Sequence, residues 1–195
     1  MDLSFLRLVP SPDLAVWVEN FWFMRGEGPG AMPDGHRILP DGCMEFVFQL
    51  GDPFRERQGD GSWRLQPHVL LVGQMERRTD IEPSGSIHTI GVHFRPAGAS
   101  AFVPGGVSRF THRIEPLGPA LGQALEPWVA RLRASATPEA QARVLEDFLG
   151  RLRLRTVGSK QDRVDRVLDY FVRAPNFVLG LPPPSPSATG EIPVT

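Results

Sequence analysis

The chain has 195 residues, with 21 basic and 22 acidic side chains and a hydrophobic fraction of 41%. This length suits one large domain, or a main domain with a small appendage, and the apolar fraction excludes wholesale disorder. The net charge of −1 argues against a wholly basic nucleic-acid-binding protein. Glycine and proline each occur 20 times, together about a fifth of the chain against roughly 12% in average proteins, so much of the chain must lie in turns.

The cysteine content and the N-terminus indicate the compartment. A single cysteine, Cys43, cannot form an intrachain disulfide and leaves no cysteine pair for a structural zinc site. Asp2 and Pro10 break any signal-peptide pattern at the start of the chain. Because no run of about 18 apolar residues occurs, we expect no membrane span and a cytoplasmic protein.

Residues 1–113 are predicted to form a β-rich sensor domain. Ser11 and Pro12 open a helical turn, since they supply an N-cap and a first helical residue. Five segments dense in apolar residues are then predicted as strands: 20–24, 36–39, 43–50, 68–72 and 87–94. The segment 51–62 is predicted to be a polar loop. Short strands separated by turns favour a β-barrel or a sandwich.

The period of the apolar residues then changes to that of helices. Two or three amphipathic helices, acting as linking or dimerisation helices, are predicted over 114–157. Pro127 must break or kink the first of them near Glu126. Thr137 and Pro138 supply the N-cap and the first residue of the next helix. The predicted fold class is therefore α+β.

Catalytic and metal signatures are few. His88 and His93 are five residues apart in a predicted strand, so they point to opposite faces and cannot share a metal directly. The other histidines could converge only through the fold. Cys43 begins an apolar strand, where a small buried thiol is more usual than a nucleophile. No Gly-x-Ser-x-Gly or His-Glu-x-x-His motif occurs. We expect no catalytic residue, no metal and no cofactor.

The candidate residues for binding a small ligand lie in the β-rich part. Asp41 and Glu45 are four residues apart around a turn and could bind a ligand hydroxyl or amine, although Asp before Gly is first a turn former. Trp22 belongs to a group of aromatic residues that could line a pocket or simply form the core. Arg95 ends the last strand and could face an anionic ligand or solvent. The predicted pocket comprises Trp22, His36, Asp41, Glu45 and Arg95.

Four blocks of residues occur in a fixed order along the chain. They are the run 18–22, Ile38-Leu39-Pro40-Asp41-Gly42-Cys43, Val72-Gly73-Gln74, and Gly91-Val92-His93-Phe94-Arg95-Pro96-Ala97-Gly98. In this order they resemble the N-terminal domain of a group of AraC-type bacterial transcription regulators, a domain whose own ligand is undefined. The resemblance covers about residues 8–173. It implies a cupin-like β-domain followed by linking helices, with a small-molecule effector and a homodimer formed through helices 117–155.

The chain departs from such regulators after its helices. The regulators continue into a DNA-binding domain of two helix-turn-helix units, which needs at least ~77 residues at about 11 residues per helix. Only 34 residues follow Gln161. We therefore predict that 158–175 form the first helix of a truncated or frame-shifted DNA-binding domain and that 176–195 form a disordered, proline-rich tail. No DNA-binding residue is expected here, and DNA would be bound only through a domain that this chain lacks.

The sequence thus predicts the ligand-sensing and dimerisation domain of an AraC-like regulator, without enzymatic activity. A ligand would enter the β-domain and change how the helices over 117–155 pack against a second subunit. Two alternatives stay open. One is a metal-dependent enzyme of cupin type, and the other is an interaction protein that forms inactive heterodimers with full-length regulators through its amphipathic helices.

Overall fold

The computed structural model of the chain describes residues 3–27 and 36–153. All of these residues belong to one compact unit, which spans Met1–Val157. The helix predicted over 158–175 and the tail predicted over 176–195 lie outside the described residues. The described part is a mostly antiparallel β-domain with three α-helices at its C-terminal end.

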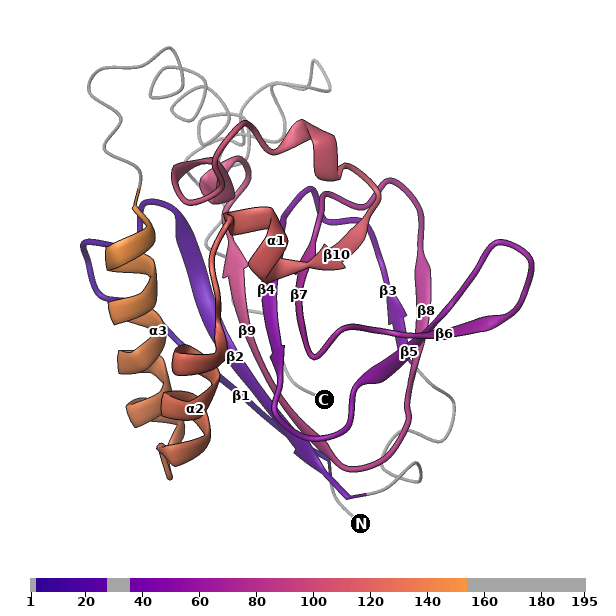
Figure 1. Cartoon of the computed structure of the whole chain (residues 1–195), viewed down its shortest axis with the longest axis horizontal. Coiled ribbons are helices and arrows are strands. Elements are labelled where there is room, and N and C mark those ends of the chain that lie inside the picture. Colours follow the sequence, from indigo (N-terminus) through magenta and orange to yellow (C-terminus); the bar gives the residue numbers. More distant parts are fainter. Residues whose placement is uncertain (1–2, 28–35, 154–195) are drawn as a thin grey trace, which may run out of the picture. The chain divides into compact units, whose positions relative to one another are not determined.

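The strands form two sheets, and every paired strand is antiparallel to its neighbour (Figure 1). The six-stranded sheet has the order β1 (Ser4–Leu8), β2 (Val18–Gly26), β9 (Ile87–Phe94), β4 (Glu45–Gln49), β7 (Val69–Val72) and β10 (Ile114–Pro116). The four-stranded sheet has the order β3 (His36–Ile38), β8 (Thr79–Pro83), β5 (Phe54–Arg57) and β6 (Trp63–Leu65).

The predicted strands are confirmed, β9 at both ends and the other four with shifted ends. The prediction of a polar loop over 51–62 is wrong, because β5 lies within it. Buried and exposed residues alternate along it, with Phe54 and Glu56 buried on one face and Arg55 and Arg57 exposed on the other. Three of its four residues are charged, so composition alone hides the strand. The sequence patterns also do not predict β1, β6, β8 or β10.

The helices are α1 (Leu117–Leu121), α2 (Glu126–Ala134) and α3 (Pro138–Leu152). The predicted break falls between α1 and α2. Gly122 ends α1 with a φ of 66°, and Pro127 lies in the first turn of α2, where its missing N–H is not needed. The predicted cap of α3 is confirmed, since the Thr137 hydroxyl accepts a hydrogen bond of 3.2 Å from the Ala140 N–H. None of the described helices is long and apolar enough to cross a bilayer.

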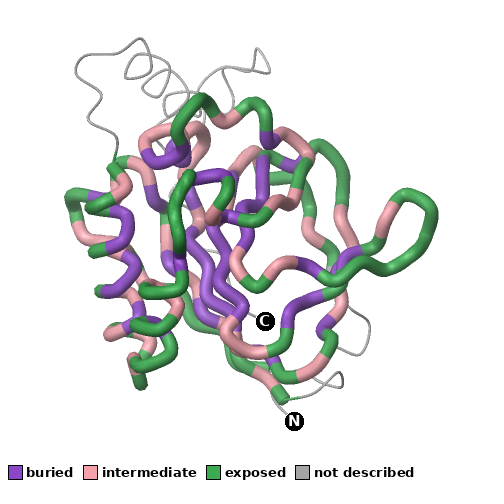
Figure 2. Tube along the Cα trace, in the orientation of Figure 1, coloured by how far each residue is buried: buried purple, intermediate pink, exposed green. Residues whose placement is uncertain are grey.

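The main core lies between one face of the six-stranded sheet and the helices. Alternate residues of the central strands fill it: Phe21, Phe23, Phe46, Phe48, Ile90, Val92 and Phe94. Helix α3 contributes Phe148, whose ring meets Phe48 edge to face at 5.8 Å. Buried positions accordingly follow the central strands and one side of α3 (Figure 2). The four-stranded sheet lies on the other side of the six-stranded sheet (Figure 1). Strand residues between the core positions therefore face away from the helices.

Candidate functional site

His93 in β9 lies at the centre of a polar cluster on the sheet face that points away from the helices. Its neighbours Val92 and Phe94 are fully buried in the core on the opposite side. Glu45 lies directly across from His93 in the β4–β9 pairing. This register lets the His93 Nδ1–H donate to Glu45 Oε1 over 2.7 Å. The Trp22 indole N–H also donates to Glu45 Oε1, over 3.2 Å, so one carboxylate oxygen holds both rings.

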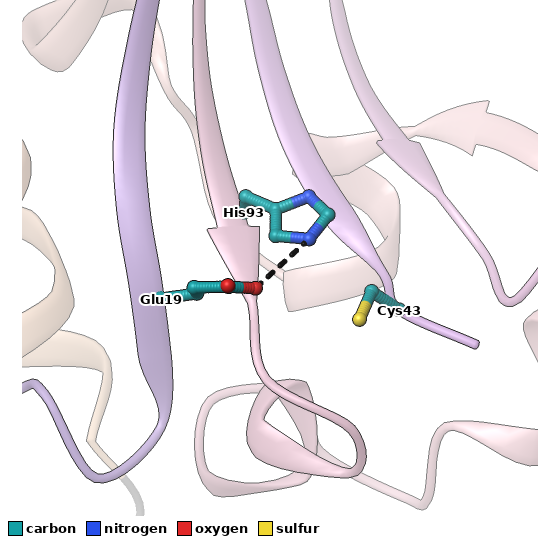
Figure 3. Close-up of side chains that lie close together, drawn as sticks. All are labelled: Glu19, Cys43 and His93. Atoms are coloured by element: carbon teal, nitrogen blue, oxygen red, sulfur yellow. Dashed lines mark ion pairs between the residues drawn. The ribbon is translucent and has the colours of Figure 1, made fainter. Parts of the chain in front are cut away.

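The other ring nitrogen of His93 faces two carboxylates and a thiol. Nε2 lies 3.4 Å from Glu19 Oε2 and 3.7 Å from Asp41 Oδ2. The ligand atoms of Glu19, Cys43 and His93 all lie within 4.8 Å of one another. Figure 3 shows His93 between the Glu19 carboxylate on β2 and the Cys43 thiol at the start of the chain segment that leads into β4. We call Glu19, Trp22, Asp41, Cys43, Glu45 and His93 the His93 cluster.

Two local backbone features bring the outer members of the cluster to His93. The β2–β9 register shifts between Val18 and Asn20, so Glu19 is the extra residue of a β-bulge opposite the end of β9. Such a bulge re-aims a side chain that regular alternation would send to the other face. Asp41 and Cys43 flank a turn in which Gly42 has a φ of 78° and Asp41 Oδ1 accepts a 2.9 Å hydrogen bond from the Cys43 N–H.

An aromatic wall borders the cluster. Trp22 lies directly opposite Gly91 in the β2–β9 pairing, and its indole occupies the space that a Cβ on residue 91 would take. The Phe5 ring stacks on the indole at 6.2 Å with an interplanar angle of 24°, although Phe5 is itself half exposed. The site therefore combines a group of acidic hydrogen-bond acceptors with a flat apolar surface, the two kinds of contact that fix a small ligand in a pocket.

The cluster is buried on one side and open on the other. The side chains of His93 and Glu45 are 17% and 25% exposed, whereas those of Glu19 and Asp41 are 51% and 56% exposed. Burial alone would lower the pKa of His93. Its side-chain hydrogen bonds with Cys43 and Glu45, and electrostatic attraction to both, outweigh burial and raise the pKa to about 10. Strongly perturbed groups in an accessible position of this kind are typical of functional sites.

His88, on the same strand, has the opposite environment. It points to the helix side of the sheet, where its Nε2 lies 3.4 Å from the Gln141 amide nitrogen of α3. Burial, with the charges of Arg25 and Arg133, lowers its pKa. The prediction that His88 and His93 point to opposite faces is therefore confirmed.

The structure brings together three of the five residues predicted as the pocket: Trp22, Asp41 and Glu45. Arg95 makes a different contact from the one predicted. Its Nε–H donates to the Ala15 carbonyl over 2.8 Å, which links the segment before β2 to the end of β9. His36 lies in β3, a strand of the four-stranded sheet. A ligand-binding role for the five residues stays a prediction.

Sequence reasoning missed Glu19, Cys43 and His93 as site residues. The expectation of no metal considered pairs of histidines, whereas the structure surrounds one histidine with a thiol and carboxylates. A signal was present: three of the four blocks that carry the AraC-type resemblance supply every cluster residue except Glu45, which follows the second block by two positions. The blocks therefore meet around one imidazole.

A separate apolar groove of about 820 Å³ lies between α1, α2 and β7. Its lining includes the apolar residues Val69, Leu125 and Val129. The polar lining residues are His68, Gln123, Glu126 and Arg133. Among the residues that the structure describes, the groove contains no group of three His, Cys, Asp or Glu side chains close enough to share a metal ion, as Glu19, Cys43 and His93 are. The His93 cluster is therefore the better candidate for specific recognition.

Comparison with known proteins gives one family. Residues 6–116 match a family described as Domain of unknown function (DUF6597), a range that contains the whole His93 cluster. The chain matches no curated protein. It is similar to the solved structure of a protein called ethanolamine utilization protein Q, from Salmonella typhimurium LT2, with 14% identity and a TM-score of 0.35. That similarity covers 47% of this chain and 68% of the other.

Proposed function

The chain belongs to the DUF6597 family of domains of unknown function, and on that premise we propose that it is the ligand-sensing domain of an AraC-type transcription regulator. Its small effector binds at the His93 cluster. The observation that carries the proposal is the convergence of polar side chains from two separate segments, 19–22 and 41–45, on His93, beside the aromatic wall of Trp22 and Phe5.

The alternative is that the His93 cluster only stabilises the fold and binds no ligand. A structural network is expected to be closed to solvent and internally balanced in charge. This cluster has one imidazole against three carboxylates, and its Nε2 side is open to solvent through Glu19 and Asp41. Both properties favour a site that receives a ligand.

The regulator part of the proposal is supported by the AraC-type resemblance, whose blocks supply most of the cluster. The role in such a regulator is to bind, so we propose no chemical turnover, and a bound effector should be recovered unchanged. Ligand binding would change the packing of the helices over 117–155, which we propose as the dimerisation surface.

The strands offer a direct route for that change in packing. Glu45 faces the cluster, while the next residue, Phe46, faces the core and packs against Phe94 at 4.7 Å. Two residues further along β4, Phe48 meets Phe148 of α3. Because cores are close-packed, a ligand that draws Asp41, just before β4, toward His93 displaces β4 against β9 and moves the side chains that hold α3. The predicted consequence is a change in helix packing at the dimer surface.

The proposal is tested by screening the chelator-treated full chain against small metabolites, by thermal shift and then calorimetry. Glu45→Gln and Trp22→Ala are the test variants, and Glu82→Gln is the matched control because Glu82 pairs with Arg55 in the other sheet. A ligand at 100 times its Kd should stabilise the wild type by about 2.7 kcal/mol.

We expect at least tenfold weaker binding in both test variants and unchanged binding in the control. A ligand-induced shift in the monomer–dimer equilibrium, measured by sedimentation, should accompany binding. Binding that neither test variant weakens would move the effector site away from His93. Binding with an unchanged sedimentation profile would contradict the sensing role.

A further inference from the structure

The Nε2 edge of His93 is surrounded by donor atoms of three kinds: imidazole nitrogen, thiol sulfur from Cys43, and carboxylate oxygen from Glu19 and Asp41. Zinc binds nitrogen and oxygen at about 2.0–2.2 Å in tetrahedral geometry, which separates two ligand atoms by about 3.4 Å. The distances from His93 Nε2 to Glu19 Oε2 and Asp41 Oδ2 are 3.4 and 3.7 Å. These are long for charge-assisted hydrogen bonds, which prefer about 2.7–2.9 Å, and close to the spacing of two ligands on one ion.

The opposite edge of the ring is arranged as in metal-binding histidines. Such a histidine usually donates its second N–H to a carboxylate, which fixes the tautomer and the ring orientation. Here the Nδ1–H donates to Glu45 over 2.7 Å, and the Trp22 N–H holds the same oxygen at 3.2 Å. The imidazole is thereby held with Nε2 directed at Glu19 and Asp41.

The charge of the cluster is also that of a cation site. Elsewhere in the chain, carboxylates such as Glu56, Glu82 and Asp147 each pair with an arginine. Within the described residues, Glu19, Asp41 and Glu45 pair with His93 and with no lysine or arginine. One imidazole cannot balance three carboxylates, so a divalent cation would supply the missing positive charge.

We infer that the His93 cluster binds one divalent transition metal ion, with zinc the best fit, through His93 Nε2, Cys43 Sγ and Glu19, with Asp41 completing the set. This inference deepens the proposed function and rests on it, since it names the ligand class of the same site. The mixed donors decide the class of metal. Thiolate and imidazole suit zinc and its neighbours, whereas magnesium and calcium take oxygen ligands throughout.

The test is a metal titration of the chelator-stripped full chain. Cobalt(II) serves as the spectroscopic probe, and zinc affinity is measured by competition with a chromophoric chelator. We expect one ion per chain, intense tetrahedral cobalt bands, and a thiolate-to-cobalt band that Cys43→Ser abolishes. Magnesium should not displace the ion. Glu45→Gln should weaken zinc binding about 10–100-fold, because it replaces the carboxylate that accepts the Nδ1–H of the ligating histidine with a neutral amide.

Two further variants serve as a control for nonspecific effects and as a test that does not depend on the folding of Cys43→Ser. His88→Gln is the control, since His88 lies on the same strand and faces the helices, and its zinc affinity should equal that of the wild type. Glu19→Gln is the variant least able to disturb folding, because its side chain is 51% exposed. It should weaken zinc binding at least tenfold, and it decides the matter if Cys43→Ser does not fold.

Equal zinc affinity in the wild type and in Glu19→Gln would overturn the metal inference, as would cobalt spectra of octahedral type. The proposed function fails separately. If zinc does not bind but the stripped chain binds an organic effector that Glu45→Gln weakens, the metal inference falls and the sensor proposal stands. If neither zinc binding nor the binding of an organic ligand depends on Glu45, both the metal inference and the proposed function are wrong.

Discussion

The indole of Trp22 lies on the Cα of Gly91, and adding one methyl group at this point tests how the site is built. A Cβ on residue 91 would overlap Cε2, Nε1 and Cζ2 of the indole, far inside the normal contact distance of about 3.5–4.0 Å. The indole must therefore move by more than about 1 Å. That displacement breaks its 3.2 Å hydrogen bond to Glu45.

Two costs add in Gly91→Ala. Overpacking costs about 1–3 kcal/mol, and losing a hydrogen bond to a charged group costs about 1.5–3 kcal/mol. Since Trp22 is half-buried, water replaces part of the lost bond, and we expect the free energy of unfolding to fall by about 2–4 kcal/mol.

Urea unfolding measures this loss as a lower midpoint with an unchanged m-value. The Trp22 indole N–H signal should also move in a ¹H–¹⁵N spectrum. The matched control is Gly150→Ala in α3, where no atom lies within 4 Å of the added Cβ, and it should stabilise by up to about 1 kcal/mol. If Gly91→Ala unfolds at the wild-type urea concentration with an unmoved Trp22 signal, the described packing is wrong.

Three further perturbations have defined outcomes. Phe148→Ala should destabilise by about 3–5 kcal/mol in urea, because a ring only 1% exposed loses its contact with Phe48; a loss below about 1 kcal/mol would contradict the docking of α3. Thr137→Ala should cost about 1 kcal/mol, since it removes the 3.2 Å cap to the Ala140 N–H; an unchanged midpoint would refute the cap. In metal-free protein the raised pKa of His93 means that its stabilisation is complete below about pH 6.5 and is lost as the pH rises through about 10. The unfolding free-energy difference between wild type and His93→Gln should therefore shrink over that range, and a constant difference would exclude the shift.

The fold could be predicted where one strand or helix carries its own pattern. Ile87–Phe94 is long and apolar enough to be recognised as a strand, and Thr137-Pro138 marks the start of α3 without any tertiary information. Strand β1 has no such pattern, because its residues Ser4–Arg7 are all exposed. It is a strand through its pairing with β2, which only the assembled sheet determines.

The site could be predicted only in part for a related reason. Asp41 and Glu45 are neighbours in sequence, so the turn between them already indicated a shared location. His93 joins them because β9 pairs with both β2 and β4, an order that the sequence does not state. Glu19 reaches His93 through a β-bulge, which reverses the face that simple alternation assigns to it.

The most direct measurement is a long-range ¹H–¹⁵N spectrum of the imidazole nitrogens in the metal-free, ¹⁵N-labelled full chain. It is recorded during titration with zinc and with any organic ligand found by calorimetry. We predict that the His93 Nε2 resonance moves saturably while Nδ1 keeps its proton for Glu45, and that the His88 resonances stay in place. Saturable binding that leaves both His93 nitrogens unchanged would contradict the placement of the ligand site at this cluster.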